Sequence, residues 1–526
     1  MPHCTCIGLD YGPLSFAVAA NDVDQVNHIL TNHPTMIQER NLLGQTPLHL
    51  ATANPDCLQL LIRFANDDQL NILDNDGFAP VHYALARSRR DCRARDAEDL
   101  CDDQCPCIRS IEILLHADCS VYIFPIFGSS RAGMKFAEGM RDRRERLRFL
   151  AMRYLPPSEI EDLILDGSQV LDSRTKDVIK RLQRYGITIP TALDFEHREI
   201  LGKSVYHYLD DVNIANYFFD LGFRDVDTPD SEGFTPLATI DFIHSTPYGK
   251  PLLYALWLVK HGARLFHRLE YPSSVPPDRV IRGATSAHFA LGHIGQWLEE
   301  KYDRAELGDD PLDRDAIVRL STQILPFDER DDCDCRCCLG GCSPFIWMLK
   351  EVTAYQNKFE THQYQFIYWY LENFDFAIGQ KHHLDAIRWA TFEMLGLQHT
   401  CCYTGMYRVQ MHDADEIREI EEEQAASLEC LENLVGDFQR RVTEILERDD
   451  ANTLADLKQF WTDYWYNQVE RALTKLDGDN LTDEERKRAE DIGVKWIDES
   501  NDEEEKAEEE DRNNMQDWFR RMEEIG

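Results

Sequence analysis

Residues 44–51 read Gly-Gln-Thr-Pro-Leu-His-Leu-Ala, and residues 77–84 repeat the pattern as Gly-Phe-Ala-Pro-Val-His-Tyr-Ala. The two stretches begin 33 residues apart, and a fixed period of about 33 residues is typical of stacked helical repeats. Each helix pair of such a repeat cannot bury its apolar face alone, so neighbouring units pack into a continuous core. The sequence therefore predicts an all-α solenoid, a fold that usually binds other proteins.

Single positions of this octet have clear physical roles. Gly44 suits a turn with positive φ, Thr46 can cap the helix that follows, and Pro47 fits its first turn, where no N–H is needed. The histidines of the two stretches, His49 and His82, are interpreted as structural rather than catalytic.

The octet resembles the opening of an ankyrin repeat, in which the histidine hydrogen-bonds within the turn. Weaker copies of the pattern occur at four further places: 10–17, 202–208, 233–237 and 283–290. The resemblance implies ankyrin repeats over 10–119, with a cysteine-containing insert at 87–107, and degenerate repeats over 200–300. An irregular helical connector is expected over 120–199. The resemblance also implies a protein partner bound through the ankyrin surface.

The charge and hydropathy of the chain exclude several classes of protein. The 526 residues carry a net charge of −39, which opposes general binding to nucleic acid. The sequence contains no run of about 18 apolar residues, so we expect no membrane span. Residues 1–6 lack the basic and apolar regions of a signal peptide. We expect a cytoplasmic or nuclear protein that contacts neither nucleic acid nor membrane directly.

One basic cluster stands out against the acidic balance. Its members are Arg141, Arg143, Arg144, Arg146 and Arg148. The pattern predicts a charged helix face opposite Leu147, Phe149 and Leu150. Such a face is either solvated or a patch for phosphate or acidic groups. No heptad zipper follows it, so it is not the basic region of a zipper protein.

The strongest chemical signal is a group of five cysteines within ten residues. They are Cys333, Cys335, Cys337, Cys338 and Cys342, and a second element, His399-Thr400-Cys401-Cys402, follows. Thiolates and imidazoles are the preferred ligands of zinc, which binds four of them in a tetrahedron. Gly340 and Gly341 allow a tight backbone turn that lets distant thiols converge. The sequence predicts one structural zinc ion held by Cys335, Cys337, Cys342 and Cys402, with Cys333 and His399 as close substitutes.

Other uses of the cysteines stay open at this point. Reactive or unpaired thiols are one alternative, and disulfides, which are rare in the cytosol, are another. The insert at 87–107 carries a second group, Cys92, Cys101, Cys105 and Cys107, which suits either a metal or free thiols. Ligation by protein alone leaves no open coordination position, so a bound metal would be structural.

Three segments come after the ankyrin repeats and do not show their pattern. A helical Cys-rich module is expected over 301–410, a helical hairpin over 411–477 and an acidic tail over 478–526. Within the hairpin, 413–448 is predicted to be one long helix with a heptad-like seam, which makes self-association through this segment an option. The seam consists of Leu428, Leu431, Val435, Phe438, Val442 and Ile445.

The layout also resembles a group of ankyrin-repeat proteins of filamentous fungi. The resemblance is carried by the C-x-C-x-C…G-C-x-P block at 333–344 and by the segment 387–402. It implies partner binding, and some fungal ankyrin proteins are encoded with secondary-metabolite pathways and look like transcriptional co-regulators. Residues 1–12 contain no basic region, which favours a co-regulator over a direct DNA binder.

Signatures of catalysis are absent from the sequence. There is no phosphate-binding loop, dinucleotide fingerprint, nucleophile elbow, zinc-protease motif or kinase set. Cys338 or Cys401 beside His399 would need an oxyanion site that nothing supplies. We therefore expect no catalytic residues and no enzyme, but a protein–protein interaction scaffold. The alternatives are an ankyrin-repeat transcriptional co-regulator and a metal- or thiol-dependent sensor.

Overall fold

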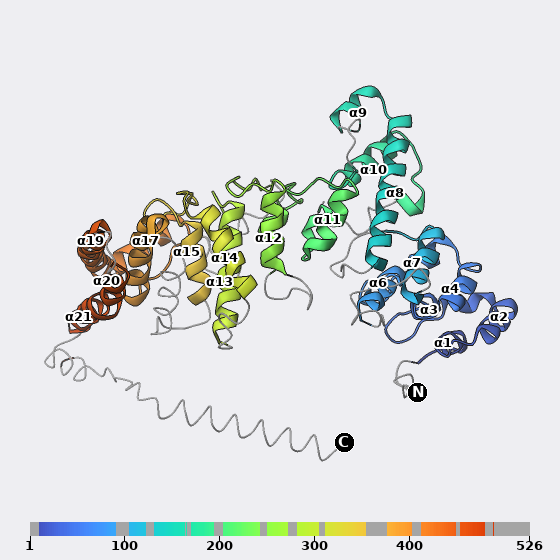
Figure 1. The fold of residues 1–526 in the computed structure, drawn as a ribbon, viewed down its shortest axis with the longest axis horizontal. Helices are drawn as coiled ribbons and strands as arrows, with labels where there is room; N and C mark the ends of the chain where they lie inside the picture. Colours follow the sequence, from blue (N-terminus) through green and yellow to red (C-terminus); the bar gives the residue numbers. More distant parts are fainter. Residues whose placement is uncertain are drawn as a thin grey trace, which may run out of the picture. The chain divides into compact units, whose positions relative to one another are not determined.

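The structure is a computed structural model and describes most of the chain. The described residues are 10–90, 105–121, 131–163, 165, 170–193, 203–241, 250–271, 281–303, 311–353, 376–401, 412–448, 453–478 and 488. Among them are helices and turns but no strand, and one isolated bridge joins Arg268 to Thr285. The predicted all-α fold is confirmed (Figure 1). None of the described helices is both long and apolar enough to cross a membrane.

The chain divides into two compact units, residues 1–465 and residues 466–526. In the second unit the structure describes α21 (Tyr466–Gly478) and residue 488. The predicted tail over 478–526 therefore lies almost entirely outside the described residues.

The N-terminal repeats are short helix pairs. Their elements are α1 (Pro13–Ala19), α2 (Val23–Asn32), η2 (Pro34–Gln38), α3 (Pro47–Ala51), α4 (Pro55–Ile62), α5 (Asp67–Leu70), α6 (Pro80–Arg90) and α7 (Pro106–His116). The first helices α1, α3 and α6 contact one another in sequence, and so do the second helices α2, α4 and α7. This stacking buries apolar residues of neighbouring pairs, such as Leu48, Leu58 and Ile111, in one core.

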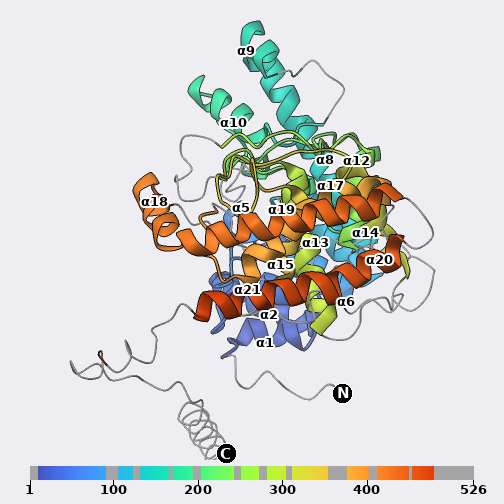
Figure 2. The same cartoon turned by 90° about the vertical axis from the view of Figure 1, so that its left-hand side faces the viewer.

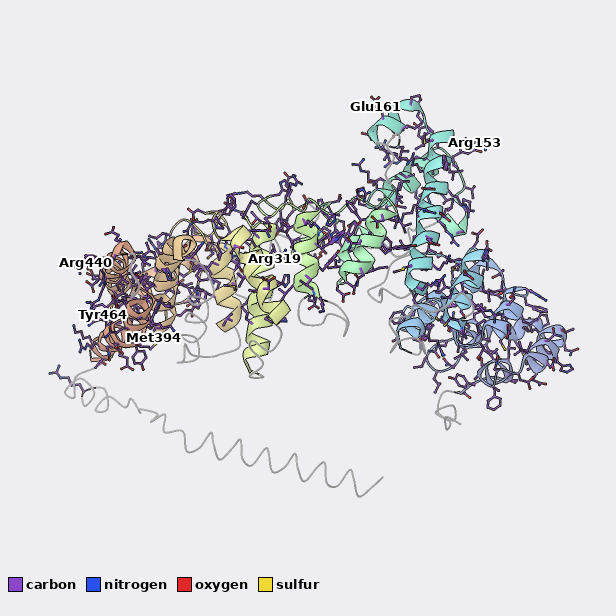
Figure 3. The ribbon with its side chains drawn as sticks, in the orientation of Figure 1. Arg153, Glu161, Arg319, Met394, Arg440 and Tyr464 are labelled. Atoms are coloured by element: carbon purple, nitrogen blue, oxygen red, sulfur yellow. The ribbon has the colours of Figure 1, made fainter. Side chains whose placement is uncertain are left out.

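The chain continues with longer and less regular helices. They are α8 (Arg131–Tyr154), α9 (Pro157–Asp162), α10 (Thr175–Arg184), η4 (Thr191–Leu193), η5 (Val205–His207), α11 (Val212–Asp220), η6 (Pro236–Thr239) and α12 (Pro251–Lys260). Figure 3 shows Arg153 in the last turn of α8 and Glu161 on α9. Repeat-like stacking is found again from residue 205 onward: η5 contacts η6, and α11 contacts α12.

The same stacking extends beyond residue 300, where the sequence pattern had ended. The next elements are α13 (Ser286–Asp303), α14 (Pro311–Ile324), α15 (Pro344–Thr353) and α17 (Phe376–Met394). First helices η6, α13 and α15 contact in order, and α12 contacts α14. The segment with the cysteine cluster is thus built like the repeats before it.

In three of the repeats, a histidine in the turn forms a hydrogen bond with the backbone of the following turn. Nδ1 of His49 accepts a hydrogen bond from the Thr46 backbone N–H at 3.0 Å. Because Nδ1 accepts, Nε2 carries the proton and donates to the Phe78 carbonyl of the following turn at 2.9 Å. The interpretation of His49 as structural agrees with this geometry.

Two later histidines repeat this arrangement. His207 Nε2 donates to the Phe234 carbonyl at 3.0 Å, and His288 Nε2 donates to the Cys342 carbonyl at 3.0 Å. Burial lowers the pKa of both His207 and His288 to about 4. Both rings are therefore neutral at pH 7, as the donor and acceptor roles require.

This burial predicts that the repeats lose stability on mild acidification. The folded-state pKa values lie below the unfolded value of about 6.5, so the stabilisation is complete above pH 6.5 and is lost as the pH falls towards about 4. Each of the two histidines is expected to lower the free energy of unfolding by about 2 kcal/mol between pH 7.5 and pH 5. Urea unfolding at the two pH values measures this loss. His207→Gln removes one titrating ring, so acidification should lower the stability of this variant by about 2 kcal/mol less than that of the parent. An equal loss of stability in the two proteins would contradict the prediction.

The C-terminal helices of this unit pack in sequence, and the prediction of one long helix over 413–448 is wrong, because Gln424 ends one helix before the next begins. The helices are α18 (Ala414–Glu423), α19 (Ala425–Arg448), α20 (Thr453–Gln459) and the π-helical η8 (Phe460–Trp465). Helix α19 contacts both α17 and α20 (Figure 2), and Trp465 Nε1 donates to Thr391 Oγ1 on α17 at 2.9 Å. Five seam residues, Leu431, Val435, Phe438, Val442 and Ile445, are buried. No second copy of the chain is needed to cover this seam.

The prediction that the arginine cluster is one charged face is wrong for two of its members. Arg143 and Arg144 are only 3% and 1% exposed. Arg143 donates to the carbonyls of Cys119 and Leu115, and Arg144 donates to the Asp172 carbonyl at 2.9 Å. These side chains bind backbone carbonyls because α8 packs on α7 and α10. Phe149, expected on the apolar side, is 65% exposed.

Candidate metal centre and partner groove

The cysteine cluster lies in an enlarged version of the ankyrin turn. In an ordinary turn of this chain, Asp74 N donates to the Phe78 carbonyl at 3.0 Å and Phe78 N donates to Asp74 Oδ1 at 2.8 Å. The same two bonds join Asp331 and Cys342, at 3.1 Å and 2.7 Å. The closing residues are four apart in the ordinary turn and eleven apart here. The extra residues carry most of the thiols.

Gly341 closes the enlarged turn. Its φ of +101° matches the +85° of Gly77, which stands just before the closing residue of the ordinary turn. A Cβ atom at Gly341 would lie 2.0 Å from the Asp331 carbonyl oxygen, so no other residue fits there. Helix α15 then begins at Pro344, as α3 begins at Pro47.

Residues from the enlarged turn and from the segment after α17 meet in one buried cluster. The ligand atoms of Cys335, Cys337, His399 and Cys401 all lie within 4.8 Å of one another. Cys401 Sγ is 3.4 Å from Cys337 Sγ and 3.3 Å from His399 Nδ1. The three thiols are at most 2% exposed. None of the described cysteines forms a disulfide.

These distances fit a tetrahedral metal site. A zinc ion with sulfur ligands at about 2.3 Å and nitrogen at about 2.0 Å separates two sulfurs by about 3.8 Å and sulfur from nitrogen by about 3.5 Å. The observed separations of 3.3 to 3.7 Å among Cys335, Cys337, His399 and Cys401 are close to these values. The cluster can therefore hold a metal ion without a large rearrangement.

His399 is oriented as a metal ligand requires. Its Nε2 donates to Glu393 Oε1 at 2.5 Å, which leaves Nδ1 facing the thiols. A carboxylate behind a histidine fixes the ring and its tautomer in many metal sites. Burial lowers the pKa of His399, but hydrogen bonds with Cys335 and Glu393 outweigh burial and raise it to about 9. A bound metal would displace the proton from Nδ1.

A buried lysine supplies positive charge to the thiols. Lys350 on α15 donates from Nζ to Cys401 Sγ at 3.0 Å and to Cys342 Sγ at 3.2 Å. Burial disfavours its charge, but the neighbouring thiols, Cys342 first, raise the pKa of Lys350 well above its usual value. Hydrogen bonds from Cys333 and other thiols lower the pKa of Cys342. The surroundings thus favour thiolate, the form that binds metals, at Cys342. At Cys337, by contrast, burial raises the pKa of the thiol.

The structure brings together most of the predicted ligands. Cys333, Cys335, Cys337, Cys342 and His399 all lie in the cluster, and Cys402 lies outside the described residues. Sequence reasoning preferred Cys402 and left out its neighbour Cys401 and also Cys338. The spacing of His399 and Cys402 suggested a helical turn, but residues 397–401 are not helical. In the insert, Cys105 and Cys107 have thiols 3.0 Å apart, and Cys92 and Cys101 lie outside the described residues.

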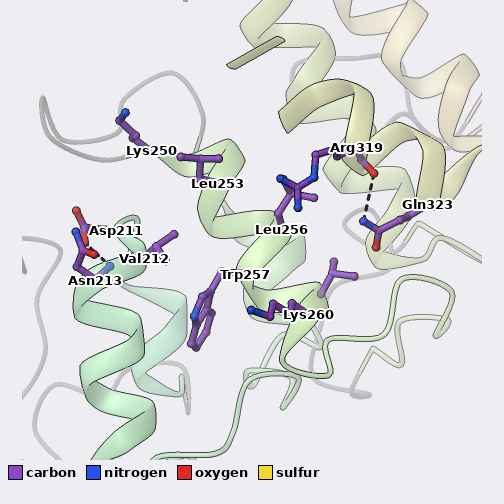
Figure 4. Close-up of a pocket in the computed structure, with 11 residues that line it drawn as sticks. Asp211, Val212, Asn213, Lys250, Leu253, Leu256, Trp257, Lys260, Arg319 and Gln323 are labelled. Atoms are coloured by element: carbon purple, nitrogen blue, oxygen red, sulfur yellow. Dashed lines mark hydrogen bonds between the residues drawn. The ribbon is translucent and has the colours of Figure 1, made fainter. Parts of the chain in front are cut away.

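A groove lies between the second helices of three consecutive repeats, α11, α12 and α14 (Figure 4). Its volume is about 940 Å³. Its apolar side chains come mainly from α12: Leu253, Leu256, Trp257 and Val259, with Val212 from α11. Lys250, Lys260 and Arg319 add three cations, and Figure 3 shows Arg319 on α14. The acidic lining residue Asp211 is engaged, because its side chain caps α11.

Comparisons with known proteins agree with the repeat structure. Residues 14–94 match the family model of ankyrin repeats in three copies, so this segment consists of ankyrin repeats. An ankyrin repeat protein of fowlpox virus, FPV031, is 33% identical over 100 residues, which are 16% of this chain and 29% of that protein. The chain thus spans less than a third of the length of this relative.

Solved ankyrin-repeat structures are also similar. The ankyrin repeat domain of Bcl-3, a member of the IkappaB protein family, matches at 15% identity over 64% of this chain and 94% of its own, with a TM-score of 0.27. The human ASB11 ankyrin repeat domain matches at 13% identity over 48% of this chain and 99% of its own, with a TM-score of 0.19. Ankyrin repeats serve as protein interaction modules and are typically not catalytic.

Proposed function

We propose that this chain is a non-enzymatic scaffold that binds a partner protein in the groove between α11, α12 and α14. The observation that carries the proposal is the charge of the groove. A chain with a net charge of −39 places Lys250, Lys260 and Arg319 around one apolar surface. Such a surface fits an acidic segment with an aromatic or aliphatic anchor residue.

The parts of the groove have different roles in this proposal. Trp257 forms a rigid wall because Nε1 donates to Asn216 Oδ1 at 2.7 Å. Trp257 is only 5% exposed, so the apolar surface open to a partner comes mainly from the half-buried Val212, Leu253 and Val259. Lys260 is exposed, and Arg319 is 62% exposed. These cations would steer and orient an acidic partner more than they would tighten its binding.

Selection of peptides from a displayed random library against the full chain tests this function. We expect enriched peptides that combine acidic residues with an apolar anchor. Lys260→Glu/Arg319→Glu should weaken their binding at least about tenfold, since two attractive contacts become repulsive. Lys180→Glu, an exposed lysine of α10, is the matched control and should bind as the parent does. Peptides without acidic residues, or equal binding to the double variant, would contradict the proposal.

We further propose that Cys335, Cys337, His399 and Cys401 hold a structural zinc ion. The buried cluster of three thiols and one imidazole supports it. The ion would tie the enlarged turn before α15 to the segment after α17. With no open coordination position, it would serve stability rather than catalysis. A sensor of metal or thiol state would use the same residues.

The second candidate function is a transcriptional co-regulator. The acidic runs 498–505 and 508–511 are followed by Trp518, Phe519 and Met522. This is the composition found in activation segments. The resemblance of 333–344 and 387–402 to filamentous-fungal ankyrin proteins supports a role of this kind in a secondary-metabolite pathway. The proposed location is cytoplasmic or nuclear. Imaging of the tagged full chain tests this candidate, and exclusion from the nucleus under all conditions would contradict it.

A further inference from the structure

We infer that the cysteine cluster binds two metal ions that share one thiolate. This inference rests on the proposed zinc site and extends it. Two tetrahedral ions with one shared ligand need about seven ligand atoms, four for each ion less the shared one. The described part of the cluster offers six thiols and the imidazole of His399.

The seven side chains form two neighbouring groups of potential ligands, one for each ion. Beside the first group, Cys333, Cys342 and Cys401 have their sulfurs within 4.8 Å of one another, and so do Cys337, Cys338 and Cys342. Cys342 belongs to both of these sets of three, but it is not in the group of Cys335, Cys337, His399 and Cys401 that would hold the first ion. Cys342 would therefore lie at the centre of the second site, and Cys333 and Cys338, each of which has its sulfur near that of Cys342, would supply the other two unshared thiols.

The fourth ligand of the second ion would be shared with the first. Two residues belong to the first group and also to one of the other sets: Cys337, with Cys338 and Cys342, and Cys401, with Cys333 and Cys342. Thiolates bridge two metal ions readily because sulfur has several lone pairs. Either thiolate completes a Cys4 site for the second ion and leaves a Cys3His site for the first.

The thiols proposed for the second ion are buried like those of the first. Cys333, Cys338 and Cys342 are at most 5% exposed. Two Zn²⁺ ions and six thiolates carry a charge of −2, which Lys350 reduces to −1 through its contacts with Cys342 and Cys401. Asp331, which organises the turn, engages backbone N–H groups of Cys333 and Cys342.

Metal analysis of the purified full chain tests the inference. We expect two zinc ions per chain in the parent and one in Cys333→Ser/Cys338→Ser, which removes ligands of the second ion alone. Cys430→Ser, a half-buried thiol on α19 outside the cluster, should keep two. One ion per chain in both the parent and the double variant would overturn the second site and leave the proposed zinc site intact. No zinc in the parent would overturn both.

Cadmium substitution covers the case in which the double variant fails to fold. The parent chain loaded with ¹¹³Cd is expected to give two resonances of equal intensity, one for a Cys4 and one for a Cys3His environment. A shared thiolate should couple the two signals. A single resonance at full occupancy would overturn the inference without any variant.

Discussion

Cys337→Ser is expected to release bound metal and to destabilise the repeats around α15 by at least about 4 kcal/mol. This is the stabilisation given by a ligand present at about 1,000 times its Kd. Cys337 is fully buried. Its thiol belongs to two of the three groups of potential ligands, one with Cys335, His399 and Cys401 and one with Cys338 and Cys342. Serine keeps the size of the side chain but offers zinc a much poorer ligand.

Thermal melting and hydrogen exchange measure this effect. We expect a lower Tm and faster exchange of the backbone N–H groups of α15 and α17, whereas α3 and α4 keep their protection because repeats contact only their neighbours. Cys430→Ser should behave as the parent does. An unchanged Tm in Cys337→Ser would mean that the cluster holds no structural metal.

Arg144→Leu is expected to cost about 3–5 kcal/mol, the loss typical of breaking one partner of a buried ion pair. The Arg144 guanidinium lies 3.9 Å from the Asp172 carboxylate and also donates to the Asp172 carbonyl and to Thr175 Oγ1. Both side chains are nearly inaccessible to water. Leucine would leave the carboxylate of Asp172 buried without this cation.

Urea unfolding of the full chain measures the cost. Arg146→Leu is the matched control, because Arg146 stands on the same helix, is 52% exposed and pairs with the exposed Asp118. It should change stability by less than about 1 kcal/mol. Equal effects of the two substitutions would show that Arg144 does not join α8 to α10 in the way described.

Much of the fold could be predicted from local sequence signals. The Gly-x-Thr-Pro-Leu-His octet at 44–51 contains the turn, the cap and the linking histidine, so the ankyrin repeats were identified directly. Beyond residue 300 the period is lost, because Gly283 and Gly341, the turn glycines, stand 58 residues apart. The turn between Asp331 and Cys342 is enlarged, and Ile346 replaces the histidine. Gly341-Cys342-Ser343-Pro344 still follows the pattern and could have identified this repeat.

The buried arginines show why charge alone misleads. Arg143 and Arg144 follow Met140 by three and four residues and precede Leu147 by similar steps. Met140 and Leu147 are fully buried, so helical spacing places both arginines on the core face. What the sequence could not supply was the set of carbonyls at the ends of neighbouring elements that these guanidinium groups bind.

The cluster of potential metal ligands was predicted in kind but not in detail. Residue type pointed to zinc ligands, and Cys335, Cys337 and His399 do approach one another. The choice between Cys401 and Cys402 depends on the backbone after α17, whose path no local pattern determines. The participation of Lys350 was also not visible, because a lysine on an apolar helix usually reaches water.

The proposed zinc ion ties the enlarged ankyrin turn to the segment after α17 through Cys335, Cys337, His399 and Cys401. X-ray absorption at the zinc edge of the purified full chain tests it most directly. The account predicts a first shell dominated by sulfur at about 2.3 Å, with a minor nitrogen contribution at about 2.0 Å. A shell of oxygen and nitrogen alone, or a protein without zinc whose cluster thiols all react freely, would contradict it.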